Sequence, residues 1–244
     1  MSAFPNTFAS MQLEPIDDGI WIAEGEIVSF YGFPYPTRSV IVRLADGGLW
    51  VWSPVRLTDE LAAAVEALGP VTHLVSPNKI HHLYLGDWKA RYPDARLWGL
   101  PTVIRKRPDL DFHAPLTATP PPDWADEIDQ TWFRGSPAMD EAVFHHKPSR
   151  TVILADLIEN FGDDFLHRHW SWWRRMLARI DGITARAPGA PREWRLSFVN
   201  RTPARAARDT MLGWDCERVV MAHGDWQRTD GHDFLARAFA WLGG

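Results

Sequence analysis

The order of strand-like and helix-like segments along this chain leaves few architectures open. Three strand-like segments open the chain, at residues 19–31, 38–44 and 49–52. A second set lies at residues 131–133, 141–146, 151–156 and 218–222. Each set is followed by helical segments. Because every sheet has to bury one face, two such halves predict an α/β fold with two sheets face to face and helices outside them.

The helical segments have defined ends. Thr58-Asp59-Glu60 supplies a helix start, apolar residues follow at helical spacing, and Gly69-Pro70 ends that helix. Further helices are expected to about Arg91 and at residues 163–181, 203–212 and 233–242. Two more strands are expected at residues 71–75 and 96–99, and the segment 105–125, rich in proline and charge, is expected on the surface.

Bulk composition narrows the class of protein. With 244 residues, 45% apolar and 23% charged, we expect one compact domain over 1–244, with 1–14 as a flexible N-terminal arm. The net charge of −5 argues against nucleic acid. The single cysteine, Cys216, excludes an internal disulfide and a thiolate cluster, so we expect a cytoplasmic protein whose metal ligands are histidines and carboxylates. No membrane span or signal peptide is expected.

Three strands end in residues that commonly bind metal ions. Residues 71–75 lead to His81-His82, residues 151–155 to Asp156, and residues 218–222 to His223-Gly224. Loops beyond the carboxyl ends of strands face a common rim in layered α/β proteins. His81, His82, Asp156 and His223 are therefore predicted to form one metal site. Each residue alone has an ordinary alternative, as a packed imidazole, a helix cap or a turn residue.

The loop Ser76 to His82 resembles the signature loop of the metallo-β-lactamase superfamily, Thr-His-x-His-x-Asp-His. The match puts Pro77 and Lys79 at the first two His positions, His81 at the Asp position and His82 at the last His position. Half of the pattern is therefore rewritten.

Two further segments extend the resemblance. Asp156 matches the Asp that bridges two metals in the family, and His223 matches the closing His-Gly. The remaining histidine of the first metal position falls near residues 134–137, where Ser136 is nearest. The chain is similar to an uncharacterised bacterial branch of the superfamily, a domain of unknown function with a Pro-Asn-x-x-His-His loop. The resemblance implies a four-layer αββα sandwich.

The differences from the family motif have a pattern. All three residues that bind only the first metal in the family are missing from this chain. The resemblance therefore implies a mononuclear site for one divalent ion, with zinc the leading candidate and iron or manganese as alternatives. Lys79 is expected to place an ammonium where the first metal would lie and to stabilise negative charge on a substrate oxygen. The alternative for Lys79 is a solvated loop residue.

A predicted hairpin turn at Lys147-Pro148-Ser149-Arg150 indicates which other polar residues lie near Asp156. Antiparallel pairing around this turn puts Asp156 opposite Glu141, so Glu141, or Asp140, is expected to orient a ligand or carry a proton. The same pairing places His145 and His146 near the turn, away from Asp156, and excludes them from the site.

Other residues have weaker signals. Asn78 and Trp226 are candidates for the pocket wall, with loop scaffolding as the preferred interpretation. Arg201, Arg205 and Arg208 could attract an anion, although such stripes are usually solvated. The Trp-rich helix, residues 165–177, is expected to pack in the core or at a homodimer contact, with membrane docking as the lesser alternative.

These features favour a metal-dependent hydrolase acting on a small, anionic molecule, with Lys79, Glu141 and Asp156 in catalysis. Two alternatives stay open. One is a catalytically silent binding or interaction module, and the other is a mononuclear iron oxidoreductase.

Overall fold

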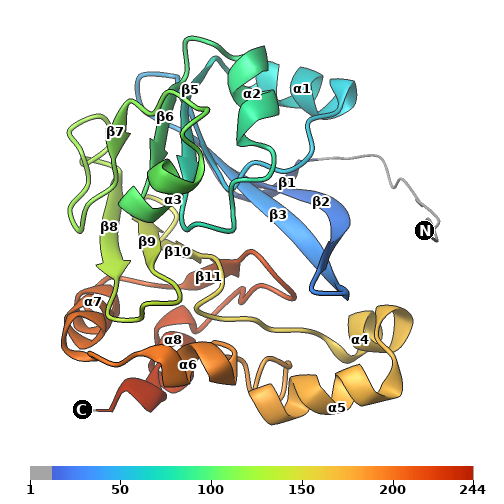
Figure 1. Cartoon of the computed structure of the whole chain (residues 1–244). Coiled ribbons are helices and arrows are strands. Elements are labelled where there is room, and N and C mark those ends of the chain that lie inside the picture. Colours follow the sequence, from blue (N-terminus) through green and yellow to red (C-terminus); the bar gives the residue numbers. More distant parts are fainter. Residues whose placement is uncertain (1–12, 244) are drawn as a thin grey trace.

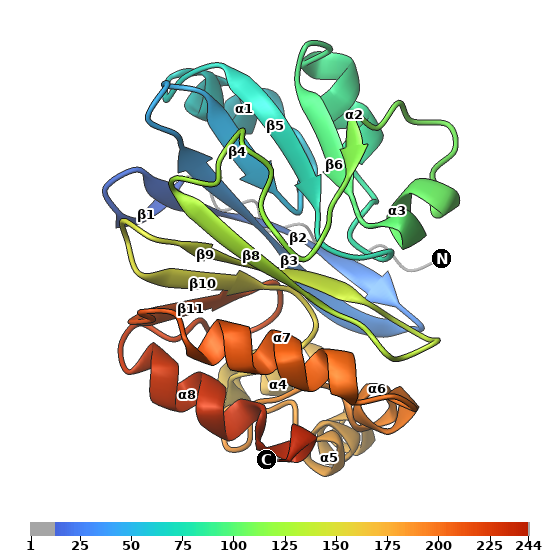
Figure 2. The same ribbon diagram turned by 90° about the vertical axis from the view of Figure 1, so that its left-hand side faces the viewer.

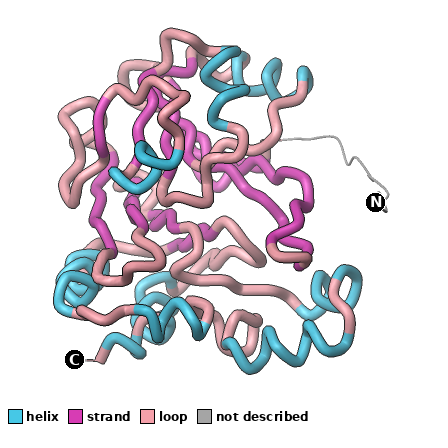
Figure 3. Tube along the Cα trace, viewed as in Figure 1, coloured by secondary structure: helices cyan, strands magenta, loops and turns pink. Residues whose placement is uncertain are grey.

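Two β-sheets face each other in the computed structural model, which describes residues 13–243, and helices cover the outer face of each sheet (Figures 1 and 2). Figure 3 shows the strands in the middle of the molecule and the helices at its two ends. The αββα sandwich predicted from the order of elements is confirmed.

The first sheet has seven strands that follow one another in chain order. They are β1 (Glu14–Asp17), β2 (Ile20–Phe30), β3 (Phe33–Arg43), β4 (Leu49–Trp52), β5 (Val71–Ser76), β6 (Arg96–Gly99) and β7 (Ala114–Pro115). Pairing is antiparallel from β1 to β4 and parallel from β4 to β7. Tyr31 and Gly32 join β2 to β3 with φ angles of 48° and 83°, as a two-residue primed turn requires.

The second sheet has four strands in the order β11 (Arg218–Met221), β10 (Thr151–Leu154), β9 (Glu141–His146) and β8 (Ile128–Phe133). Only β10 and β11 run parallel. Every residue of β10 is buried, as expected for a central strand covered on both faces. The parallel pair directs the ends of β10 and β11 to the same edge, where β5 of the first sheet also ends.

Helices flank both sheets. Those on the first sheet are α1 (Asp59–Glu66), α2 (Leu85–Arg91) and α3 (Pro101–Lys106). Those on the side of the second sheet are α4 (Asp163–His169), α5 (Trp172–Asp181), α6 (Arg192–Ser197), α7 (Thr202–Leu212), α8 (Gly231–Ala238) and the 3-10 turn η1 (Ala240–Leu242). Thr58 caps α1 by accepting a hydrogen bond from the Leu61 N–H, as the sequence indicates.

Aromatic side chains fill the space between the sheets. Trp50 of β4 and Phe144 of β9 meet edge to face with ring centroids 5.1 Å apart, and both are fully buried. A separate apolar cluster lies between the second sheet and helices α7 and α8. The sandwich therefore has a core between its sheets and another beneath the second helical layer.

The Trp-rich segment forms two helices, so the prediction of one continuous helix over 163–181 is wrong. The backbone is extended at Trp170 and Ser171, between α4 and α5. Trp170 is buried, and its indole N–H donates to the carbonyl of Pro34 at 2.9 Å. Burying this indole against the β2–β3 hairpin takes the residue out of helical geometry.

Helix α5 exposes one apolar face. Trp172, Met176 and Ile180 lie one turn apart and are 69%, 49% and 54% exposed. The role of this face as a contact surface stays a prediction. Across residues 13–243, no helix combines the length and apolarity needed to span a bilayer.

Two other expectations need adjustment. The surface excursion at 105–125 includes the short strand β7, which extends the first sheet, and α3 precedes it. The expected N-terminal arm lies largely outside the described residues, and Glu14 already belongs to β1.

Buried His73 should make folding stability sensitive to acid. Trp98 donates to its Nδ1 at 3.1 Å, and burial lowers its pKa from 6.5 to about 4. Above pH 6.5 the ring is neutral in both states, whereas between pH 6.5 and 4 the unfolded chain binds the proton more readily. The free energy of unfolding therefore falls as the pH falls through this window.

We predict that His73→Asn, which keeps an acceptor for Trp98, loses less stability than wild type between pH 7 and pH 4. The difference should reach at most about 3 kcal/mol, from 1.36 kcal/mol per pKa unit. Denaturant titrations at both pH values measure it, with exposed His232→Asn as the matched control. Equal acid sensitivity in wild type and His73→Asn would contradict this account.

Candidate metal centre

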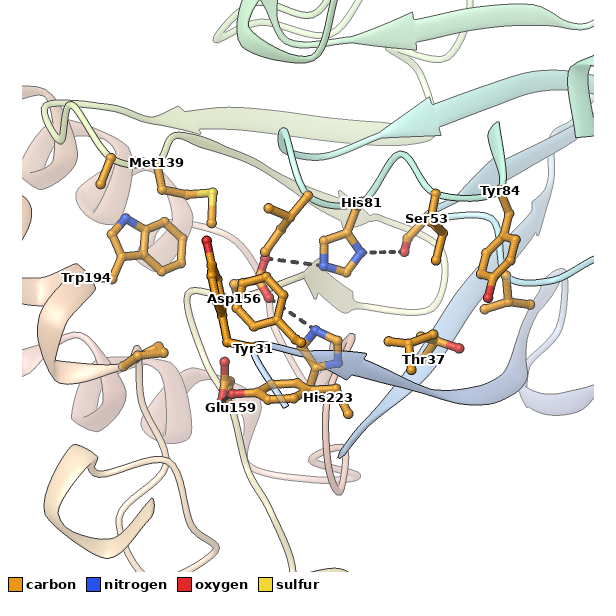
Figure 4. A pocket seen from close by; sticks show the side chains of 18 of the residues that line it. Tyr31, Thr37, Ser53, His81, Tyr84, Met139, Asp156, Glu159, Trp194 and His223 are labelled. Atoms are coloured by element: carbon orange, nitrogen blue, oxygen red, sulfur yellow. Dashed lines mark hydrogen bonds and ion pairs between the residues drawn. The ribbon is translucent and has the colours of Figure 1, made fainter. Parts of the chain in front are cut away.

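Three side chains meet where β5, β10 and β11 end. His81 Nε2 lies 3.2 Å from Asp156 Oδ2, and His223 Nε2 lies 3.2 Å from Asp156 Oδ1 (Figure 4). One donor atom of each residue lies within 4.8 Å of the other two. His81, Asp156 and His223 will be called the triad. The predicted convergence of three strand ends is therefore present in the structure.

The loop after β5 aims His81 at the triad. Asn78 Oδ1 accepts from the Ile80 N–H at 3.0 Å, and Ser76 Oγ donates to the His81 carbonyl at 2.8 Å. On the far side of the imidazole, Nδ1 lies 2.7 Å from Ser53 Oγ. Ser53 has a φ of 48°, an uncommon angle for a non-glycine residue, and this conformation follows directly after β4.

His223 is oriented from the opposite sheet. Its Nδ1 lies 2.7 Å from the carbonyl oxygen of Pro36 in β3. A carbonyl only accepts, so Nδ1 carries the proton and Nε2 faces Asp156. The Tyr35 ring packs edge to face on the imidazole with centroids 5.0 Å apart.

Gly224 allows the chain to turn beside His223. Its φ is 86°, and an added Cβ would collide with the carbonyl of Asn160. In return, Asn160 accepts from the Asp225 N–H at 2.8 Å and donates its side-chain amide to the Asp225 carbonyl at 2.7 Å. The close approach of Asn160 therefore explains why a glycine follows His223.

Glu141 and Asn78 hold Asp156 from behind. Glu141 accepts hydrogen bonds from the backbone N–H groups of Ala155 and Asp156 at 2.7 and 2.9 Å. Asn78 Nδ2 donates to Glu141 Oε2 at 3.0 Å and to Asp156 Oδ2 at 2.7 Å. The expected pairing of Glu141 with Asp156 is present. Asn78 holds the loop and the Asp156 carboxylate in place, which agrees with the scaffolding role preferred for it from the sequence.

Burial, neighbouring charges and hydrogen bonds all shift the pKa values of these groups. Burial alone would raise the pKa of Asp156, but His81, together with hydrogen bonds from His223 and His81, lowers it well below the usual range. Burial would lower the pKa of His81, yet Asp156 raises it. Burial and the Asp156 charge raise the pKa of Glu141, against the two backbone donors. The triad therefore favours an ionised Asp156 carboxylate.

The donor set of the triad suits a metal ion. Two imidazole nitrogens and a carboxylate are ligands for zinc or iron, and three protein ligands leave a position open for another molecule. The far ring nitrogens contact Ser53 and Pro36, the outer contacts that fix metal-binding imidazoles. The residues present therefore fit a divalent metal ion.

The structure brings together three of the four predicted ligands, and His82 is not among them. A role for His82 as a ligand stays a prediction. Adjacent residues in this turn point different ways, and His82 Nδ1 is buried without a hydrogen-bond partner. Burial, with Lys106 and Arg107 nearby, lowers the pKa of the His82 imidazole. Of the two adjacent histidines, only His81 lies in the triad.

Lys79 is half-buried beside the triad loop, where its carbonyl accepts from Lys106 Nζ at 2.9 Å. It is not among the residues that line the cavity beside the triad. The structure therefore does not bring the Lys79 ammonium into the site, and its catalytic role has no support in the geometry.

Residues considered as alternatives lie elsewhere. Asp140 accepts from Thr102 and Trp132 and so faces α3. His145 and His146 pair with Asp215 and Ser149, away from the triad as predicted. Ser136 Oγ lies 2.6 Å from Ser197 Oγ, and Trp226 is outside the triad cavity.

The arginine stripe of α7 has a structural role. Arg201, Arg205 and Arg208 donate to the carbonyls of Trp241, Leu242 and Gly243. These hydrogen bonds hold η1 and the following Gly243 against α7. The structure gives no support to the alternative that the stripe attracts an anion.

A cavity of about 520 Å³ opens beside the triad. In Figure 4, Met139 and Trp194 lie on one side of Asp156, and Tyr84 and Thr37 on the other. Its lining also includes Val28, Phe30, Tyr31, Tyr35, Ser53, Pro54, Val55, Ile80, Leu83, Ala138, Glu159, Pro191 and Glu193. This size is usual for a small-molecule site.

Sequence reasoning missed Ser53, Tyr35 and Glu159. The Tyr35 hydroxyl donates to Glu159 Oε2 at 3.2 Å, and both side chains line the cavity. Burial and the Asp156 charge raise the pKa of Glu159 well above its usual value. Tyr35 and Ser53 lie more than 100 residues before Asp156, so no local pattern links them to it. Glu159 follows Asp156 by three residues and could have been noted.

The fold and the triad together define a metallo-β-lactamase fold. Similar solved structures include a metallo-β-lactamase from Pontibacter korlensis, with a TM-score of 0.62 and 13% identity over 95% of this chain and 98% of that one. One from Erythrobacter litoralis, with β-mercaptoethanol in its active site, has a TM-score of 0.65 and 12% identity over 97% and 98%. FIM-1 from Pseudomonas aeruginosa, in a mono-zinc form, has a TM-score of 0.57 and 12% identity over 95% and 94%.

Within this fold, the chain belongs to the family described as Domain of unknown function (DUF4336), whose model matches residues 17–165. The matched segment includes His81 and Asp156 and ends before His223. No curated protein matches the chain. The expected resemblance in fold to the metallo-β-lactamases and the expected match to a domain of unknown function are both confirmed.

We predict that Gly224→Ala destabilises the fold by at least about 2 kcal/mol more than Gly47→Ala. Both glycines have a φ of 86°, and an added Cβ at Gly47 meets nothing within 4 Å. Each substitution forces an L-residue into the left-handed region, at about 1–2 kcal/mol. Only Gly224→Ala adds the collision with Asn160. Denaturant titration compares them, and equal losses would show that the close approach is unimportant.

Proposed function

We propose that this protein is a metal-dependent hydrolase with a mononuclear site, in which His81, Asp156 and His223 hold one zinc ion. The observation that carries the proposal is the geometry of the triad, with three donor atoms within 4.8 Å of one another. The contacts of Ser53 and Pro36 on the outer ring nitrogens support it, because they leave both Nε2 atoms directed at Asp156.

A single ion is favoured by what stands at the positions of the first family metal. Pro77 and Lys79 provide no imidazole there, and Ser136 pairs with Ser197. The similar FIM-1 structure is of a mono-zinc form, which supports the idea that this fold accommodates one ion. Iron or manganese would also accept the same donors.

A bound ion would supply Lewis-acid chemistry, acidifying water and polarising a substrate oxygen. The chain would supply the rest. Ser53 and Pro36 keep the imidazoles oriented, Asn78 and Glu141 keep Asp156 in place, and the apolar lining limits the water around a substrate.

Glu141 would act as a positioning residue, because its oxygens are occupied by backbone and Asn78 donors and it does not line the cavity. Glu159 is the better candidate to hold a proton. It is buried, it lines the cavity, and Tyr35 fixes its Oε2. This replaces Glu141 as the expected proton carrier.

One alternative follows from the same donor set. Two histidines and one carboxylate also hold mononuclear iron in oxygenases, so redox chemistry is the second candidate. A catalytically silent binding module is the third. A cytoplasmic location and a homodimer contact through α5 remain proposals from the sequence.

The adjacent histidines provide a matched test of the metal site. We predict about one zinc per chain in wild type and His82→Ala, and loss of at least 90% of it in His81→Ala. His81 points at Asp156, whereas His82 does not, although both lie in the same turn. Elemental analysis after dialysis against zinc measures the content, and thermal unfolding with and without zinc checks that each variant folds.

Other outcomes separate the alternatives. Stoichiometric iron in protein purified without added metal would favour the redox candidate. Absence of metal from folded wild type, or equal loss in His81→Ala and His82→Ala, would contradict the proposed centre. Hydrolysis of chromogenic esters that needs zinc and is lost in Asp156→Asn would support hydrolase activity.

A further inference from the structure

The cavity beside the triad has a one-sided charge pattern. Three carboxyl groups line it, those of Asp156, Glu159 and Glu193, and no lysine or arginine is among its lining residues. Asp156 is already paired with His81 and His223, so Glu193 is the carboxyl group left to meet a ligand charge at the exposed end. Sites for anionic molecules generally present arginine, lysine or backbone N–H groups to the anion. This wall offers no lysine or arginine, and the exposed carboxylate of Glu193 presents the opposite charge.

The three carboxyl groups differ in their exposure. Asp156 and Glu159 are buried, at 4% and 3% exposure, and lie at the inner end. Glu193 is exposed on α6, next to buried Trp194, which also lines the cavity. A ligand with its reacting group at the triad would therefore share the cavity with Glu193.

Arginines near the cavity are directed elsewhere. Arg195, one residue after Trp194, donates to the carbonyl of Asp181. Arg56 pairs with Glu26 at 2.8 Å, and the Arg174 guanidinium lies over the rings of Phe33 and Trp173. Arg38 donates to Glu24 and to the Met221 carbonyl. An anionic group in the cavity would find none of these side chains in the lining.

The remaining wall is apolar. Met139 and Trp194 face the space on one side, and Phe30, Val55 and Leu83 contribute from other loops. Such a surface gains free energy by covering an alkyl or aromatic group. Among the described residues of the lining, the other polar side-chain groups are hydroxyls, the indole N–H of Trp194 and the triad itself.

We propose that the substrate of this site is an uncharged or cationic molecule with an apolar body. An anionic small molecule, which the sequence favoured, does not suit the lining. The reaction rests on the hydrolase function proposed above, whereas the selectivity for charge follows from the cavity wall alone.

Three octyl probes that share one chain and differ in charge test this selectivity: octanol, octyltrimethylammonium and octyl sulfate. Binding to the full chain is measured by isothermal titration calorimetry below the concentration at which the probes aggregate. We expect octanol and octyltrimethylammonium to bind at least tenfold more tightly than octyl sulfate. None of the probes needs zinc, so failure of the metal centre and failure of this inference are seen separately.

Two test variants and one control variant show whether the probes bind in the cavity. Glu193→Lys should narrow or reverse the preference, whereas Asp18→Lys, the same charge change at a fully exposed site, should leave it unchanged. Met139→Trp should weaken all binding by filling the cavity. Equal or tighter binding of octyl sulfate by wild type would overturn the proposal. Undetectable binding of all three probes, or binding insensitive to Glu193→Lys and Met139→Trp, would overturn it equally.

Discussion

The structure depends on accommodating one buried negative charge, the carboxylate of Asp156. A carboxylate removed from water needs compensating partners, because its desolvation is otherwise costly. His81 and Asn78 provide them from the loop after β5, and His223 provides another from the segment after β11. Each of these segments follows a strand, so the same requirement fixes how the strand ends meet.

The site also depends on contact between the two sheets. His223 follows β11 of the second sheet, yet its Nδ1 is held by Pro36 of β3 in the first. Two residues before His223, the Met221 carbonyl accepts from Arg38 Nη1 at 2.7 Å, again across the sandwich. His223 is therefore correctly placed only when both sheets have packed, which couples the site to the complete fold.

Local patterns in the sequence were sufficient for the element order and for part of the site. Counting residues about the 147–150 turn places Glu141 opposite Asp156, and the structure shows Glu141 accepting from the Asp156 N–H. Such counting works because an antiparallel hairpin has a fixed register once its turn is known. The break at Trp170 was not foreseen, because it depends on a contact with Pro34, far away along the chain.

Side-chain direction within loops was the other limit. His81 and His82 are equivalent by residue type, and only the turn from Asn78 to Tyr84 decides which imidazole points inward. The same applies to Lys79, which neighbours the triad in sequence but does not line its cavity. Ser53 directly follows β4 and Tyr35 lies in β3, so their proximity to the triad is a product of the tertiary fold.

Anomalous X-ray diffraction at the zinc absorption edge, from crystals of the zinc-loaded full chain, tests the central claim most directly. The account predicts one anomalous peak per chain, bounded by His81 Nε2, Asp156 and His223 Nε2, with His82 outside its coordination sphere. A second peak toward Lys79 and Ser136, a peak bound by His82, or no peak between the three side chains would contradict it.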